Sequence, residues 1–195
     1  MIEPKNCWIE VAKDSDFSIY NIPFGIFSTP TKSKRVGIAI GSQVLDLEAA
    51  YQSGIFDCFM DEKAFIVSVF RNSYLNNFIS LGKKITSKLR IKIQEELCDS
   101  NSKINHPKFF EALNDVQMHI PVQVGDYTDF YSSIEHATNV GSLFRDPENA
   151  LLPNWKHMPV AYHGRASSII GTEIPIHRPK GPVSYTHLTL PTTPY

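Results

Sequence analysis

The side chains best suited to bind a cation, move a proton or hold an anion are concentrated in one stretch, Gly125–Asp146, which reads GDYTDFYSSIEHATNVGSLFRD. It contains three aspartates, two tyrosines, one histidine and one arginine. A neutral imidazole can act as a general base, a carboxylate can bind a hard cation, and a guanidinium can hold a carboxylate. This stretch is therefore the candidate site of the chain.

Local sequence rules predict a helix inside this stretch. Ser132-Ser-Ile-Glu135 fits the capping box, with Ser132 as N-cap and Glu135 at the third helical position, so the helix is expected to begin at Ser133. His136 then lies in the first turn. The helix dipole there disfavours the imidazolium and favours an anionic ligand group.

The residues before this helix are expected to be extended. In an extended segment the side chains at i and i+2 share a face, so Asp129 and Tyr131 should point the same way while Phe130 points into packing. Residues before an N-cap commonly touch the first helical turn. We therefore expect Asp129, Tyr131 and His136 to converge at the helix N-terminus.

Each residue also has a purely structural interpretation, which the sequence leaves open. Aspartates next to glycine often form turns, and a histidine in a first turn is often a half-buried hydrogen-bonding group. Aromatic residues are most simply core or interface residues, and an arginine beside an aspartate can form a turn ion pair. The residues concerned are Asp126, Asp129, Tyr131, His136, Arg145, Trp155 and Tyr162. Their co-occurrence is what favours a site.

The elements that must position this stretch follow from the pattern of apolar residues. Trp8–Val11 and Phe24–Phe27 are expected to be short strands, and Arg35–Ile40 with Gln43–Leu47 are expected to form a hairpin around the Gly41-Ser42 link. The N-terminal part is therefore predicted to be rich in β structure.

The middle of the chain, residues 48 to 113, carries helical signals. Helices are expected over Ala64–Phe70 and Tyr74–Leu97, the second with a break near Gly82. Its apolar residues recur near the helical period at Leu75, Phe78, Ile79, Ile85, Leu89, Ile93 and Leu97. Further strands are expected at Met118–Val122 and within Ser168–Ile176.

Composition excludes several kinds of protein. The 195 residues carry 19 basic and 20 acidic side chains, a net charge of -1 with no basic cluster, which argues against a nucleic-acid partner. No window approaches the roughly 20 apolar residues of a membrane span, and the N-terminus lacks a signal peptide. Three dispersed cysteines, Cys7, Cys58 and Cys98, suit free thiols in a reducing compartment. We therefore expect a cytoplasmic protein.

The absence of several known motifs also argues against some chemistries. The sequence has no GxGxxG after a strand, no GxxxxGKS/T, no GxSxG and no HExxH. Dinucleotide sites, P-loop sites, serine hydrolase sites and zinc sites are therefore not predicted. A metal, if bound at Asp129, is expected to be a hard ion such as Ca²⁺ or Mg²⁺, and Ca²⁺ takes about six to eight oxygen ligands.

The long run from Gly125 to Ile170, which continues as PENALLPNWKHMPVAYHGRASSII, resembles the opening of the catalytic domain of the fumarylacetoacetase family. DSDFSIYNIPFGIFST and RVGIAIGSQVLDL resemble the small SH3-like domain of that family. The resemblance covers residues from about 8 to 181. It implies a hydrolase that cleaves a carbon-carbon bond of 4-fumarylacetoacetate to give fumarate and acetoacetate, at the end of tyrosine and phenylalanine degradation.

The same resemblance implies roles for individual residues. Asp129 matches a Ca²⁺ ligand, His136 matches the histidine that activates water, and Tyr131, Arg145 and Tyr162 match substrate-binding positions. It also implies Ca²⁺ and Mg²⁺ as cofactors, a small-molecule substrate and a homodimer of the full-length protein. These assignments agree with the convergence expected from the capping pattern.

The family pattern implies a mixed α+β, β-rich fold. Residues 1–118 are expected to form an SH3-like domain with a helical segment, and 119–183 the incomplete start of a β-roll catalytic domain. Residues 184–195 depart from the family and are expected to be a non-native or aberrant tail. Because the family's other metal ligands would lie beyond this point, we expect the chain by itself to be inactive and to bind Ca²⁺ weakly or not at all. A non-catalytic SH3-like interaction fragment is the alternative.

Overall fold

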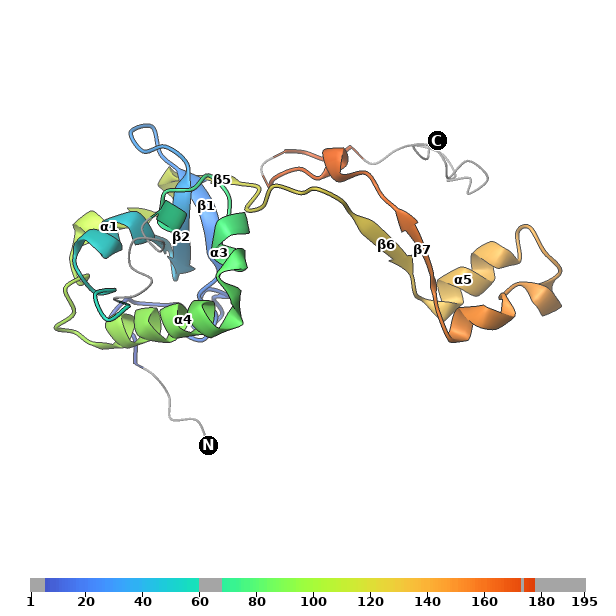
Figure 1. Ribbon diagram of the computed structural model, residues 1–195, viewed down its shortest axis with the longest axis horizontal. Coiled ribbons are helices and arrows are strands. Elements are labelled where there is room, and N and C mark those ends of the chain that lie inside the picture. Colours follow the sequence, from blue (N-terminus) through green and yellow to red (C-terminus); the bar gives the residue numbers. More distant parts are fainter. Residues whose placement is uncertain (1–5, 60–67, 173, 178–195) are drawn as a thin grey trace. The chain divides into compact units, whose positions relative to one another are not determined.

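A computed structural model describes residues 6–59, 68–172 and 174–177 of the chain (Figure 1). These residues divide into two compact units. The first unit contains residues 6–59, 68–123 and 170–172, and the second contains residues 124–169 and 174–177. The expected combination of helices with a β-rich N-terminal part is confirmed.

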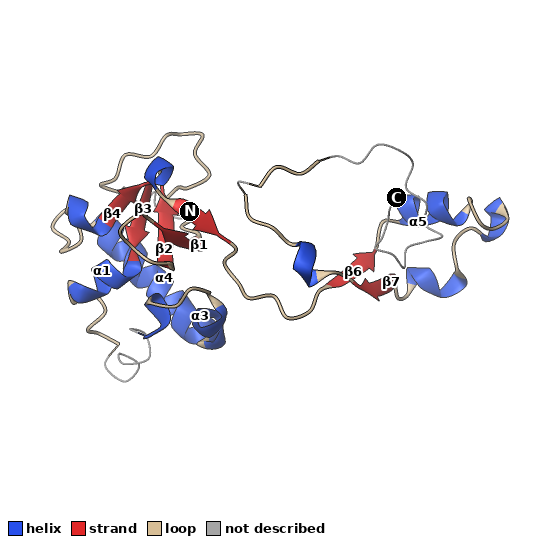
Figure 2. Cartoon of the chain, turned by 90° about the horizontal axis from the view of Figure 1, so that it is seen from above, coloured by secondary structure: helices blue, strands red, loops and turns tan. Residues whose placement is uncertain are grey.

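The first unit is built on one antiparallel sheet of five strands in the order β4-β3-β2-β1-β5, of which Figure 2 labels β4 to β1. The strands are β1 (Phe24–Ser28), β2 (Arg35–Ile40), β3 (Gln43–Asp46), β4 (Phe110–Ala112) and β5 (Gln117–His119). Ile38 at the centre of β2 lies opposite Phe24 of β1 and Leu45 of β3. β5 pairs with β1 and forms the edge of the sheet opposite to β4.

Helices cover one face of this sheet (Figure 2). They are α1 (Leu47–Gln52), α3 (Asn76–Ser80) and α4 (Gly82–Cys98). Alternate residues of β2, Val36, Ile38 and Ile40, face these helices and share one core with Leu89 and Ile93 of α4. A smaller cluster on the opposite face contains Phe27, Val44 and Val116.

The predicted hairpin is confirmed as β2 and β3, and Gly41 in its link has a φ of 56°, which only glycine adopts without strain. The prediction of a strand at Trp8–Val11 is wrong. The backbone N–H of Trp8 donates to the Leu97 carbonyl at 3.1 Å and its indole N–H donates to the Glu96 carbonyl at 3.0 Å. These donors therefore satisfy the C-terminal end of α4 and not a neighbouring strand.

The helical prediction for Tyr74–Leu97 is largely confirmed, with the break at Gly82, where φ is 77°. Ile79 was expected in the core but is 58% exposed, because it lies in the short helix α3, which runs at an angle to α4 (Figure 1). The helix expected over Ala64–Phe70 lies mostly outside the described residues, which include only its last three positions. Phe110–Ala112 was placed in the helical zone but forms β4.

The second unit combines a two-stranded antiparallel sheet, β6 (Thr128–Tyr131) with β7 (Val160–His163), and one helix, α5 (Ile134–Gly141). Short 3-10 helices occur in both units, at Pro107–Phe109, Leu113–Asp115, Pro147–Asn149, Pro153–Lys156 and Ala166–Ser168. The strand expected within Ser168–Ile176 is not found among the described residues of that range. The backbone turns there, since the Ser168 N–H donates to the Arg165 carbonyl and the Ile169 N–H to the Ala166 carbonyl.

Within the part of the chain that the structure describes, no helix is both long and apolar enough to cross a bilayer. The tail predicted at residues 184–195 lies outside the described residues. Residues 118 and 119, where the sequence placed a domain boundary, lie within β5.

Candidate functional site

A pocket of about 480 Å³ lies in the second unit, between the β6-β7 ribbon, α5 and the loop that follows α5. All five residues that the sequence assigned to a site line it: Asp129, Tyr131, His136, Arg145 and Tyr162. The remaining lining is mostly apolar and comprises Phe130, Ala137, Val140, Ala150, Leu151, Leu152, Trp155 and Val160. A small group of polar side chains in an apolar pocket is the usual form of a small-molecule site.

The pairing of β6 with β7 places Tyr162 opposite Asp129. The Tyr162 hydroxyl donates a hydrogen bond to Oδ2 of Asp129 at 2.7 Å, between residues 33 positions apart in the chain. Asp129 and Tyr131 lie on one face of an extended segment, as predicted. Phe130 was expected to be packed, but its side chain is 59% exposed, because it alternates to the other face of a ribbon of only two strands.

Helix α5 begins one residue later than predicted. Its N-cap is Ser133, whose Oγ accepts a hydrogen bond from the His136 backbone N–H at 3.2 Å, while Ser132 Oγ donates to the Phe130 carbonyl at 3.4 Å. The capping box required Glu135 at the third helical position. Glu135 is instead at the second, where its carboxylate lies 3.1 Å from the Ser133 hydroxyl. The Glu135 carboxylate therefore accepts a hydrogen bond from the hydroxyl of the N-cap residue and does not occupy the position that the capping box requires.

His136 is thereby held at the third position of α5, beside Tyr131. The two rings pack edge to face, with centroids 5.0 Å apart and planes at 84°, and the Tyr131 hydroxyl donates to the His136 carbonyl at 3.3 Å. The structure thus brings together Asp129, Tyr131 and His136 near the start of one helix.

Arg145 reaches the pocket from the loop after α5. Its Nη1 donates to the Ala150 carbonyl at 3.0 Å, and its backbone N–H donates to the Gly141 carbonyl at 2.9 Å. The alternative of an ion pair with Asp146 is not observed. Asp146 instead caps the 3-10 helix at Pro147–Asn149 by accepting from the Glu148 N–H at 3.0 Å. Among the described residues no carboxylate forms an ion pair with Arg145, which leaves its charge available to a ligand.

Trp155 has a structural role that the sequence allowed but did not assign. Its side chain is buried, and the indole N–H donates to the Tyr131 carbonyl at 3.0 Å, which fixes the end of β6. Leu151 and Leu152 line the pocket beside it. This wall of the pocket was not predicted from the sequence, although the apolar residues Leu151, Leu152 and Trp155 within residues 151–155 were a signal for it.

The donor set offers little to a metal ion. Asp129 is the one carboxylate that lines the pocket, and no group of three or more His, Cys, Asp or Glu side chains that could hold a metal occurs within the described residues. Ca²⁺ takes about six to eight oxygen ligands, and Mg²⁺ requires octahedral coordination. Among the described residues, Asp129 can therefore supply one ligand of a Ca²⁺ or Mg²⁺ site, but these residues do not form a complete site.

Residues 20–121 match the family model for the N-terminal part of fumarylacetoacetase. The chain belongs to the fumarylacetoacetase family. It is 46% identical over 180 residues to the fumarylacetoacetase of Mus musculus, an alignment that covers 89% of this chain and 42% of the relative. The fumarylacetoacetases of Dictyostelium discoideum and Homo sapiens are 45% and 43% identical, covering 89% of this chain and 41% and 42% of the relatives. The chain thus spans about two fifths of the length of these fumarylacetoacetases.

Proposed function

We propose that this chain supplies one part of a site that hydrolyses a carbon-carbon bond of 4-fumarylacetoacetate, releasing fumarate and acetoacetate at the end of tyrosine and phenylalanine degradation. The supporting observation is the convergence of Asp129, Tyr131, His136, Arg145 and Tyr162 in one pocket. Membership of the fumarylacetoacetase family supports the same reaction.

Arg145 binds a carboxylate group of the substrate in this proposal. The guanidinium uses one N–H on the Ala150 carbonyl, and its other donors can form charge-assisted hydrogen bonds with an anionic ligand. The Tyr131 and Tyr162 hydroxyls contact the polar groups of the bound substrate. The apolar side chains that include Leu152 and Trp155 line the rest of the pocket.

His136 acts as the general base. It takes a proton from water, and the resulting hydroxide forms a bond to a ketone carbonyl carbon of the substrate. The bond from this carbon to the acetoacetate portion then breaks, and the electron pair leaves with acetoacetate as a carbanion that its own carbonyl stabilises. The imidazolium returns a proton to this carbanion, which completes the hydrolysis with His136 again neutral.

Asp129 is proposed as a ligand of Ca²⁺. Because the described residues do not complete a Ca²⁺ or Mg²⁺ site, the chain alone is expected to bind substrate groups without turning substrate over. The negative charge that develops on oxygen during attack needs more positive groups than Arg145 alone supplies.

Two measurements on the 195-residue chain test this proposal. NMR titration with fumarate and with acetoacetate is expected to shift signals of the pocket residues, and Arg145→Ala is expected to weaken binding about 10-fold or more by removing a charged hydrogen-bond donor. Incubation with 4-fumarylacetoacetate is expected to give no fumarate. Shifts confined to residues outside the pocket would contradict the assigned site, and detectable turnover would contradict the expected inactivity.

A second candidate, a non-catalytic interaction module, is favoured by one observation. A groove of about 450 Å³ on the sheet of the first unit is lined by Phe24, Phe27, Met118 and Pro121. Aromatic grooves of SH3 domains bind Pro-rich peptides. However, Phe27 is fully buried, and Phe24 packs on Phe78 with ring centroids 4.6 Å apart. These rings therefore pack in the interior of the first unit and are not free to contact a peptide. Titration with Pro-rich peptides would separate the candidates, since only the module should bind them.

A further inference from the structure

The loop between α5 and the apolar wall of the pocket is closed by a contact between its two ends. Residues 142–149 are exposed, whereas Gly141 before them and Ala150 after them are buried. Gly141 is the last residue of α5, and the Phe144 N–H donates to its carbonyl at 3.1 Å. The loop therefore has a narrow neck formed by Gly141 and Ala150.

This neck requires glycine at position 141. A Cβ on Gly141 would overlap the carbonyl oxygen of Ala150, which is backbone and cannot rotate away like a flexible side chain. Gly141 is not among the glycines with positive φ, which are Gly41, Gly54 and Gly82. The requirement at this position is therefore one of space and not of backbone conformation.

The carbonyl that occupies this space is also the anchor of Arg145. The Ala150 oxygen accepts the hydrogen bond from Nη1 of Arg145 at 3.0 Å, and the Arg145 backbone N–H is bound to the Gly141 carbonyl at 2.9 Å. Both ends of Arg145 are thus fixed to the two residues of the neck. If Ala150 moved away from Gly141, the guanidinium would lose its acceptor and with it a defined place in the pocket.

We propose that Gly141 is a positioning residue for Arg145: its missing side chain lets the Ala150 carbonyl sit where it holds the guanidinium in the pocket. The inference rests on the proposed function only in assigning a carboxylate ligand to Arg145. Gly141 itself contacts no substrate in this scheme. It acts through the Ala150 carbonyl alone.

Three glycine variants of the 195-residue chain test this inference. Gly141→Ala introduces the overlap with Ala150. Gly125→Ala is a matched control in the same unit, where a Cβ meets no atom within 4 Å, and Gly164→Ala is a control for crowding, because its Cβ would overlap the Tyr127 ring and not the neck. With Trp8→Phe added to each variant, Trp155 emission reports whether the second unit keeps its fold.

The first readout needs no ligand. NMR of the Arg145 guanidinium is expected to show slowed hydrogen exchange in the unmodified chain and in both control variants, and exchange like that of a free arginine in Gly141→Ala. A guanidinium that stays protected in Gly141→Ala would overturn the inference. Equal loss of protection in Gly164→Ala, or loss of the Trp155 signal in Gly141→Ala, would also overturn it, because Gly141 would then serve the fold in general.

The second readout is titration with fumarate. Gly141→Ala is expected to weaken fumarate binding by about 10- to 100-fold, as expected for a lost charged hydrogen bond, while Gly125→Ala binds as the unmodified chain does. If Gly141→Ala releases the guanidinium but the unmodified chain does not bind fumarate, the positioning role stands and the proposed function fails. If Gly141→Ala releases the guanidinium and fumarate binding is unchanged, the positioning role stands and the assignment of the substrate carboxylate to Arg145 fails.

Discussion

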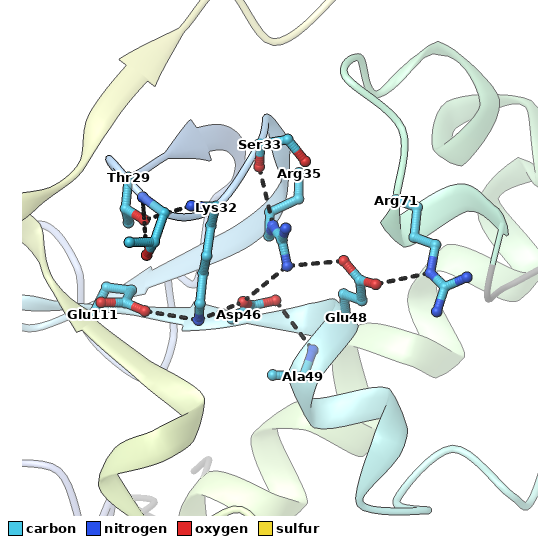
Figure 3. A network of polar contacts seen from close by, with 10 residues as sticks. Thr29, Lys32, Ser33, Arg35, Asp46, Glu48, Ala49, Arg71 and Glu111 are labelled. Carbon is cyan, nitrogen blue, oxygen red and sulfur yellow. Dashed lines mark hydrogen bonds and ion pairs between the residues drawn. The ribbon is translucent and has the colours of Figure 1, made fainter.

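Asp46 is a fully buried acid whose carboxylate is surrounded by donors (Figure 3). Its Oδ1 accepts from the Ala49 N–H at 3.1 Å and caps α1, and its Oδ2 lies 3.0 Å from Lys32 Nζ and 3.6 Å from Arg35 Nη1. Lys32 also binds Glu111 of β4 at 2.7 Å. Asp46 of β3 thus connects the turn after β1 with the start of β2 and with α1, and Lys32 extends the network to β4.

The pKa of Lys32 reflects this network. Burial lowers the pKa of its ammonium, but hydrogen bonds to Glu111 and Asp46 together with their charges raise it, and the net direction is upward from 10.5. A group whose pKa rises on folding contributes stability that is fully present below its unfolded pKa. The contribution is therefore present at neutral pH and is lost only as pH rises above 10.5 through the folded value.

Replacing Asp46 by alanine is expected to lower the free energy of unfolding by about 3 kcal/mol, because it removes a helix cap and leaves two partly buried cations without their shared partner. Urea unfolding followed by circular dichroism measures the loss. Arg71→Ala is the matched control in the same network, since Arg71 is 59% exposed and binds Glu48 at 2.8 Å. It should cost less than about 1 kcal/mol. Equal losses in the two variants would contradict this account.

At the scale of secondary structure, α5 is the element that positions the candidate base. It has only 8 residues, so its start depends strongly on the cap at Ser133. The capping box pattern located this helix but shifted the cap to Ser132. The capping box depends only on the spacing of Ser132 and Glu135. The helix start observed in the structure also accompanies tertiary contacts, since Tyr131 packs beside His136 and the Trp155 indole binds the end of β6.

Ser133→Ala and Ser132→Ala distinguish the two registers. Ser133→Ala is expected to destabilise the second unit by about 1 kcal/mol by removing the acceptor of the His136 N–H. Ser132→Ala should have a smaller effect, because its hydroxyl makes only a 3.4 Å hydrogen bond to the Phe130 carbonyl. Urea unfolding followed by Trp155 fluorescence, with Trp8→Phe present in both variants, measures both losses. A larger loss in Ser132→Ala would restore the cap predicted from the sequence.

At the scale of the whole molecule, the two units differ in how much apolar surface they bury. Both core clusters consist of residues of the first unit. Among the described residues of the second unit, the buried apolar side chains are Ala137, Ala150 and Trp155. Since apolar burial is the main stabilising contribution to folding, the first unit should be the more stable one.

Each unit contains one tryptophan, which allows this difference to be measured. Trp8→Phe leaves Trp155 to report on the second unit, and Trp155→Phe leaves Trp8 to report on the first. We expect the Trp155 signal to change at a urea concentration lower by about 1 M or more, given unfolding slopes of roughly 1–3 kcal/mol per M. A single shared midpoint would mean that the two units unfold as one cooperative body.

The sequence by itself determined the features that depend on neighbouring residues. These are the β2-β3 hairpin at Gly41, the helix break at Gly82 and the extended segment before α5. The backbone preferences of glycine and the alternation of strand faces act within a few positions, so they can be read without the fold. The resemblance of Gly125–Ile170 to the fumarylacetoacetase family identified the candidate site residues, because a match of consecutive residue types can also be read without the fold.

The tertiary structure alone decided which distant residues meet. It placed Tyr162 on Asp129 through strand pairing and Arg145 on the Ala150 carbonyl through a closed loop. It also turned Trp8 toward the end of α4 and left Phe130 on an exposed face. Such contacts depend on the summed packing of segments far apart in the chain, and a local pattern contains no information about which partner is available.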